Sequence, residues 1–253
     1  MRYLMPIFLL IFTALTCMRA NAAINNGTIY SGTIQASTIP VTSAAAGISF
    51  DNNCSNAAIA DTGNGCTITV GAGANNIVFM AFGVRDNIGQ KIVDPVTIGG
   101  LNAVFVSSSE ATSIRNYLYY ATGVPTGAQQ ISATYDVAAT GVMGAISFMG
   151  VSQSAPINIP HAVDDASGSG TSVSLSIESA ANQVCVDGLV VQGDVTGSLA
   201  PSAGQTTRVN PLASITELTI HMTSKPGSAS SVTMGGDWSG GARSKYDAVC
   251  MQP

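Results

Sequence analysis

Apolar and polar side chains alternate along most of this 253-residue chain, which is the period of a β-strand with one buried face. The alternating segments and short apolar runs include residues 76–84, 116–120, 130–135, 144–149, 171–177, 183–192, 215–223 and 245–252. Gly, Pro, Asn or Ser separates them, and no window of about a dozen residues has the apolar stripe and caps of a helix. The pattern therefore predicts an all-β protein.

The expected architecture is an antiparallel two-sheet β-sandwich with jelly-roll-like connections. Residues 46–253 are expected to form one domain, because sandwiches and barrels of this length often remain undivided. A chain of this size can bury a substantial core without a second domain.

Residues 1–22 have the pattern of a signal peptide. Arg2 precedes the apolar run 4–15, and Ala20-Asn21-Ala22 forms a small-x-small cleavage pattern before Ala23. The run is too short for a permanent membrane helix, and no later segment is long and apolar enough for one. Acylation of Cys17 is the alternative, but Thr16 stands where lipoprotein signals favour a small residue. We expect a secreted or surface-attached product without an integral membrane segment.

Few charges remain after cleavage. Removal of Arg2 and Arg19 leaves seven basic against fourteen acidic residues, a net charge of −7. This balance argues against a nucleic-acid partner, whose phosphates require clustered basic groups. Only 9% of the residues are charged, against about 25% in ordinary soluble domains. Such a surface suits close packing against neighbours, although many exported sandwiches share this composition.

Four cysteines follow the signal peptide: Cys54, Cys66, Cys185 and Cys250. An even number in an exported chain predicts disulfides rather than metal ligands, and four cysteines allow three pairings. Cys54 and Cys66 bracket a loop rich in Asn, Gly and Ala, which suits a local bond. Cys185 and Cys250 each lie between apolar neighbours, as expected for a bond between adjacent strands. No CxxC pair supports a zinc site.

Residues 23–45 form a neutral, loosely alternating arm. One interpretation makes the arm the first strand of the domain. The other makes it a donor strand that completes a sheet edge in the next copy of the chain, which would produce a polymer.

From residue 76 onward, the order of segments resembles a family of exported or phage-associated bacterial β-sandwich modules, mostly without assigned function. The similarity rests on residues 96–100, on 119–127 with its Pro-x-Gly turn, on 147–157 with the pattern SFxGVxQxxP, and on 238–243. Relatives tend to close with Lys-Pro, where this chain has Gln252-Pro253. The resemblance implies a sandwich fold and no particular activity.

Candidates for chemistry are few. Asp164 and Asp165 begin a Gly- and Ser-rich segment that suits a calcium ion, but it lacks EF-hand spacing, and a solvated loop is the simpler interpretation. Isolated carboxylates leave a glycosidase pair open, since such groups need only meet in space. These carboxylates are Glu110, Asp136, Glu178, Asp194 and Glu217. The two histidines and the lack of a GxSxG motif argue against a serine hydrolase.

Trp238, in a Gly-rich turn, is the best single platform for stacking on a sugar, with a core position as the alternative. We expect a secreted, non-catalytic structural or adhesive protein that binds copies of itself or other surface components. A carbohydrate-binding module that recognises glycans is the main alternative, and a secreted glycoside hydrolase is the third. We expect no obligatory cofactor.

Overall fold

The alternating segments form strands in the computed structural model, which describes residues 47–59, 64–85, 92–111, 114–135, 141–214 and 218–253. These residues belong to one compact unit, Thr42–Pro253. They form strands, turns and loops, and every strand pair is antiparallel. The all-β antiparallel sandwich is confirmed. No helix that could cross a membrane occurs in the described ranges.

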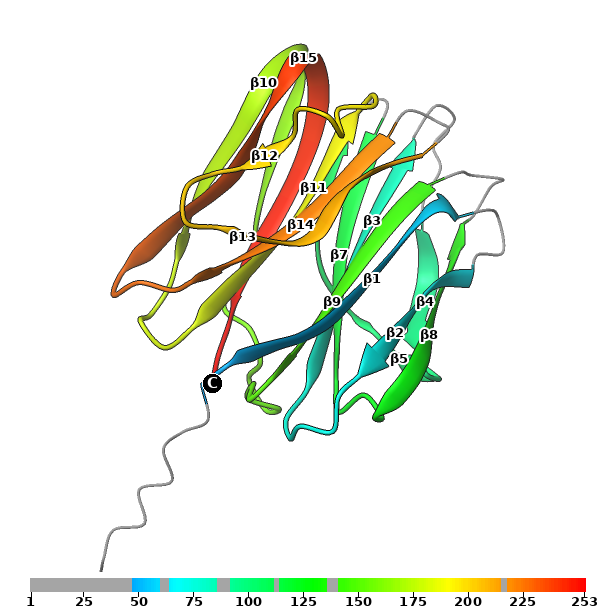
Figure 1. Cartoon of the computed structure of the whole chain (residues 1–253), viewed down its shortest axis with the longest axis vertical. Helices are drawn as coiled ribbons and strands as arrows, with labels where there is room; N and C mark the ends of the chain where they lie inside the picture. Colours follow the sequence, from blue (N-terminus) through cyan, green and yellow to red (C-terminus); the bar gives the residue numbers. More distant parts are fainter. Residues whose placement is uncertain (1–46, 60–63, 86–91, 112–113, 136–140, 215–217) are drawn as a thin grey trace, which may run out of the picture. The chain divides into compact units, whose positions relative to one another are not determined.

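The strands form three sheets rather than the two predicted from the sequence (Figure 1). The central sheet has the order β1 (Ser49–Ile59), β9 (Gly141–Met149), β3 (Ile77–Arg85), β7 (Ile114–Thr122), β6 (Val104–Ala111). The six-stranded sheet has the order β10 (His161–Glu178), β15 (Ser231–Met251), β11 (Val184–Gln192), β14 (Leu218–Pro226), β13 (Thr206–Ala213), and β12 (Ala200–Pro201) pairs with β15. The four-stranded sheet has the order β2 (Asn64–Val70), β8 (Gly127–Tyr135), β4 (Ile92–Ile98), β5 (Leu101–Asn102).

The central sheet is buried on both faces. Along β3, Val78 and Phe82 face a core shared with the four-stranded sheet, whereas Ile77 and Phe79 face a core shared with the six-stranded sheet. A strand covered on both sides needs apolar residues at successive positions rather than at alternate ones. The uninterrupted apolar run of β3 therefore places it in the middle layer.

A third core lies on the face of the six-stranded sheet that points away from the central sheet. Figure 1 shows β10 and β15 running together through a bend. Gly240 lies where the pairing of these two strands shifts register, between Asp237 and Ala242, and has a φ of +80°. Glycine adopts this left-handed conformation without the steric cost of a Cβ. Beyond the bend, the two strands return over their own sheet and enclose Trp238, Tyr246 and Leu189.

The structure contains the bonds Cys54–Cys66 and Cys185–Cys250, one of the three pairings that the sequence allowed. Cys54 lies in β1 and Cys66 in β2, so the first bond joins the central and four-stranded sheets. Cys185 of β11 lies directly opposite Cys250 of β15. The second bond therefore locks two neighbouring strands of one sheet.

The central and six-stranded sheets approach closely where small residues meet. A Cβ added to Gly188 of β11 would lie 2.7 Å from the Cβ of Ala81 in β3. Beside this contact, the Asn116 amide donates hydrogen bonds to the carbonyl oxygen of Gly188 at 2.9 Å and to Oδ2 of Asp247 at 2.8 Å. Asn116 therefore connects β7 with β11 and β15 across the interface.

Candidate functional site

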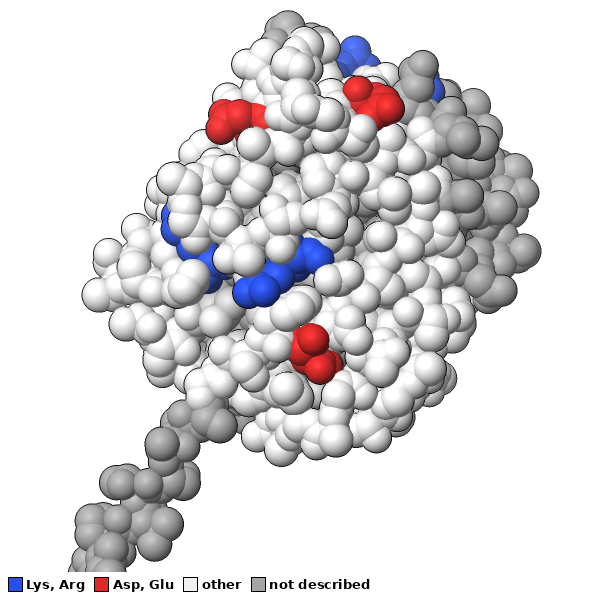
Figure 2. All heavy atoms as spheres, in the orientation of Figure 1, with Lys and Arg blue, Asp and Glu red and all other residues white. Residues whose placement is uncertain are grey.

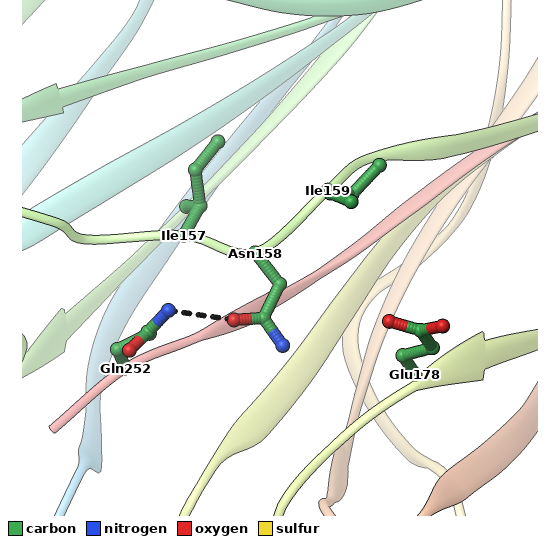
Figure 3. A pocket seen from close by; sticks show the side chains of 5 residues that line it. All are labelled: Ile157, Asn158, Ile159, Glu178 and Gln252. Atoms are coloured by element: carbon green, nitrogen blue, oxygen red, sulfur yellow. Dashed lines mark hydrogen bonds between the residues drawn. The ribbon is translucent and has the colours of Figure 1, made fainter.

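An open pocket of about 530 Å³ lies beside the ends of β10 and β15, and we call it the amide pocket. It is lined by Ile157, Asn158, Ile159, Glu178 and Gln252 (Figure 3). Two backbone hydrogen bonds hold its wall in place. Asn158 N donates to the Cys250 carbonyl at 2.9 Å, and Gln252 N donates to the Pro156 carbonyl at 2.9 Å. The segment before β10 is thus fixed against the end of β15.

Side-chain amides form a chain of hydrogen bonds in this wall. Asn158 and Gln183 form a reciprocal pair, in which each amide nitrogen donates to the other's oxygen at 3.1 Å. Gln252 Nε2 donates to Asn158 Oδ1 at 2.7 Å, and Ala180 N donates to Gln183 Oε1 at 2.8 Å. These bonds fix the orientation of the Asn158 amide.

The remaining lining combines one charge with apolar surface. Figure 3 shows the Asn158 side chain between those of Gln252 and Glu178. Glu178 is exposed at the end of β10. Ile159 is 72% exposed, the largest value among the exposed large hydrophobic residues in the described part of the chain. The pocket therefore offers a carboxylate, fixed amides and an aliphatic surface to one ligand.

A second polar cluster surrounds the buried carboxyl group of Asp187, on the face of β11 that points toward the third core. Its Oδ2 accepts hydrogen bonds from Tyr246 Oη at 2.7 Å, Thr223 Oγ1 at 2.7 Å and Gln205 Nε2 at 2.8 Å. Its Oδ1 accepts one from Thr223 N at 2.6 Å. Four donors, from strands β14 and β15 and from the turn before β13, therefore converge on this carboxyl group.

Burial changes the protonation of this cluster. Removal from water raises the pKa of Asp187 to about 6, although the hydrogen bonds from Tyr246, Thr223 and Gln205 act to lower it. The pKa of Tyr246 is raised well above its usual value by burial and by the neighbouring carboxylates. On β14, burial lowers the pKa of His221 to about 4, and its Nε2 lies 3.2 Å from Thr207 Oγ1. Asp187 and Tyr246 are almost completely buried, and their hydrogen bonds connect β11, β14, β15 and the turn before β13, so the arrangement fits a structural role.

Trp238 does not provide the exposed sugar platform considered from the sequence. It is only 4% exposed and belongs to the third core, because the strands bend beside it and cover the ring. Its indole Nε1–H is buried without a hydrogen-bond partner among the described residues. The core alternative is the one that the structure favours.

The segment that begins at Asp164 and Asp165 follows the backbone path of β10 rather than a separate loop, and these residues pair with Lys245 and Ser244 of β15. The register shifts between Asp165 and Gly170. The side chains of residues 163–169 lie outside the described part, so the calcium prediction stays a prediction. Among the side chains that are described, no three His, Cys, Asp or Glu residues group as metal ligands.

Of the five carboxylates considered for a glycosidase pair, the structure describes the side chains of two. Glu178 and Asp194 are both exposed, at the end of β10 and after β11. Asp136 and Glu217 lie outside the described residues, as does the side chain of Glu110. Residues 1–22 and the arm 23–45 also lie outside them. The first described strand, β1, begins after the arm, at Ser49.

Two groups of polar residues were missed from the sequence. Asp187 stands in the apolar run 184–191, and a carboxylate in such a run indicates a buried, hydrogen-bonded group. That signal was available. Asn158 and Gln252 gave none, because ordinary amides 94 positions apart meet only through the pairing of their two segments.

Comparisons of the chain with protein-family models, curated proteins and solved structures gave no match. The resemblance to exported sandwich modules therefore stays a prediction, and the function has to be inferred from the residues of this chain.

Proposed function

We propose that this chain is an exported, non-catalytic structural or adhesive subunit of the cell exterior, and that copies associate through the N-terminal arm, residues 23–45. Two observations bear on export. The N-terminal 22 residues have a signal-peptide pattern. The two disulfides are of a kind that persists in oxidising compartments.

The surface composition supports close association between copies. Figure 2 shows Lys, Arg, Asp and Glu as a few scattered side chains on an otherwise uncharged face. Soluble surfaces normally carry about a quarter to a third of charged residues, and burying a charge in an interface costs free energy. With 9% charged residues in the whole chain, few charged side chains lose water when two copies meet.

The observation that carries the proposal is the exposed apolar edge at β6. This strand is the last one in the central sheet, where β7 is its neighbour. Val104 and Phe105, at its start, are each 49% exposed, and Leu101 of β5 is 37% exposed. The Phe105 ring lies edge-on to Tyr119 with a centroid distance of 5.5 Å, so it is held in place. An edge strand with exposed apolar residues is a template for pairing with another strand.

The arm has the properties of a strand that would pair there. It has no charged residue, and it alternates around Ile29, Ile34 and Ile39. Twenty-three extended residues span about 75 Å at roughly 3.3 Å each, which is enough to reach a neighbouring copy. Strand addition supplies affinity through main-chain hydrogen bonds and specificity through alternate side chains.

The test is size-exclusion chromatography with negative-stain electron microscopy of the oxidised chain beginning at Ala23. We expect filaments or a ladder of oligomers from this chain, and monomers from a variant without residues 23–45. Phe105→Lys should also give monomers, because it places a charge on the acceptor edge. Ala128→Lys, which places the same charge on the interior strand β8, is the matched control and should still assemble.

Monomers of both the full mature chain and the shortened variant would reject assembly through the arm. Assembly that is lost on deletion but survives Phe105→Lys would reject β6 as the acceptor and retain the arm as the donor.

A further inference from the structure

The amide pocket has the chemistry of a site for a polyhydroxylated ligand. We propose that it binds a neutral saccharide, in a position separate from Trp238. The proposal depends on the lining of the pocket and does not rest on assembly through residues 23–45. In the adhesive protein proposed above, this pocket would be the site that contacts a glycan.

The fixed amides leave hydrogen-bonding capacity for a ligand. Asn158 Nδ2 uses one hydrogen on Gln183, and its second hydrogen has no acceptor among the described residues. The side-chain oxygen of Gln252 likewise accepts no hydrogen bond from a described residue, while Gln252 Nε2 is bound to Asn158. The wall therefore presents one donor, Asn158 Nδ2, and one acceptor, Gln252 Oε1. The hydrogen bonds among the side-chain amides restrain both side chains.

Glu178 adds a strong acceptor on the other side of Asn158 (Figure 3). Sugar hydroxyls donate and accept together, so adjacent hydroxyls can donate to the carboxylate and accept from the amide. Such charge-assisted hydrogen bonds are stronger than neutral ones. Asn158 and Glu178 thus offer complementary partners to neighbouring hydroxyl groups.

The apolar part of the lining matches the carbon face of a sugar ring. Ile159 is 72% exposed and supplies this apolar surface. Ile157 is half-buried and packs against the core of the central and six-stranded sheets, and Figure 3 shows its side chain pointing away from Asn158 and Gln252. A volume of about 530 Å³ lies within the usual range of roughly 300–1,000 Å³ for small-molecule sites. Restrained side chains also lower the ordering cost of binding.

The charge in the lining favours a neutral ligand. Glu178 is the only charged residue among the five that line the pocket, so it would repel carboxylated or sulfated sugars. One carboxylate and two amides supply fewer oxygens than the six to eight that a calcium ion takes. The pocket therefore suits direct hydrogen bonding to an uncharged sugar, without a calcium ion.

The experiment uses saturation-transfer NMR to screen the oxidised chain beginning at Ala23 against glucose, galactose, mannose, N-acetylglucosamine and their β-1,4-linked disaccharides. Calorimetry then gives the Kd of the strongest binder. We expect Glu178→Gln and Ile159→Ser each to raise the Kd at least about tenfold, the loss expected for one strong contact. Asp194→Asn removes an exposed carboxylate elsewhere and is the matched control, with an unchanged Kd.

Thermal unfolding of each variant checks that these exposed substitutions leave the fold intact. No binding of any sugar in the panel would overturn the proposal, as would wild-type affinity in both pocket variants. Binding that disappears with EDTA and returns with calcium would also overturn it. The shortened variant without residues 23–45 should keep the wild-type Kd, so the result is independent of assembly.

Discussion

The phenol of Tyr246 donates a 2.7 Å hydrogen bond to Oδ2 of Asp187, and both residues are buried between the six-stranded sheet and the strands that return over it. The same oxygen accepts from Thr223 and Gln205. The turn before β13 is thereby connected to β11, β14 and β15. Because burial raises the pKa of Asp187 to about 6, the stability of the fold should depend on pH.

Asp187 should make the fold more stable in acid. Its pKa is about 6 in the folded chain and 3.8 as the reference for the unfolded chain, so the folded state binds the proton more tightly. Its contribution is complete below pH 3.8 and is lost as pH rises through 6, by about 3 kcal/mol. Urea unfolding of wild type and Asp187→Asn at pH 4 and pH 7 tests this. The difference in unfolding free energy, wild type minus variant, should be larger at pH 4, and equal differences would contradict the prediction.

His221 should make the fold less stable in acid, the opposite of the effect of Asp187. Burial lowers its pKa from 6.5 to about 4, so its contribution is complete above pH 6.5 and is lost as pH falls through 4. The loss is about 3 kcal/mol, because one pKa unit corresponds to about 1.4 kcal/mol. His221→Gln should remove it, so the variant gains stability relative to wild type on going from pH 7 to pH 4. The same urea series measures this change, and parallel pH profiles would reject it.

Gly188 should tolerate no larger side chain. In Gly188→Ala, the new Cβ would lie 2.7 Å from that of Ala81. Both Cβ atoms are attached directly to strands that are fixed in packed sheets, so neither can move away. Such overpacking typically costs about 1–3 kcal/mol. Gly197→Ala is the control, because an added Cβ there meets nothing within 4 Å. Thermal and urea unfolding should show a loss for Gly188→Ala alone, and similar stability of the two variants would contradict the close approach of the sheets.

The two disulfides should differ in their contribution. Cys185–Cys250 spans 65 positions and Cys54–Cys66 spans 12, and a longer closed loop restricts the unfolded chain more. The chain-entropy relation gives about 4 kcal/mol for the first bond and about 3 kcal/mol for the second. Guanidinium unfolding of the two double Cys→Ala variants should follow this order. A larger loss for Cys54→Ala with Cys66→Ala would reject the loop-length argument.

The apolar runs anticipated most of the strands but not their division into layers. A run such as 76–84 indicates a strand buried on both faces, yet it does not identify what covers each face. The second cover is the six-stranded sheet, which reaches β3 and β9 through Val190, Ile220 and Met222. Its contact with β3 joins segments more than a hundred residues apart in the chain, which local alternation does not specify.

For the two polar clusters too, the local sequence did not reveal which residues meet. The apolar surroundings of Asp187 in sequence marked it as buried, but its donors come from β14, β15 and a distant turn. The neighbours of Asn158 and Gln252 gave no comparable signal. Their amides meet only because residues 156–158 lie against the end of β15.

The sequence by itself determined the strand content, the turns and the scarcity of charge, because strand alternation and turn chemistry act over a few neighbouring residues. Tertiary structure decided that there are three sheets, which cysteines bond, that Trp238 is buried and that a polar pocket forms beside β15. These features depend on register and on the stacking of segments far apart in the chain. Such long-range contacts are selected by the burial of the whole core rather than by any local pattern.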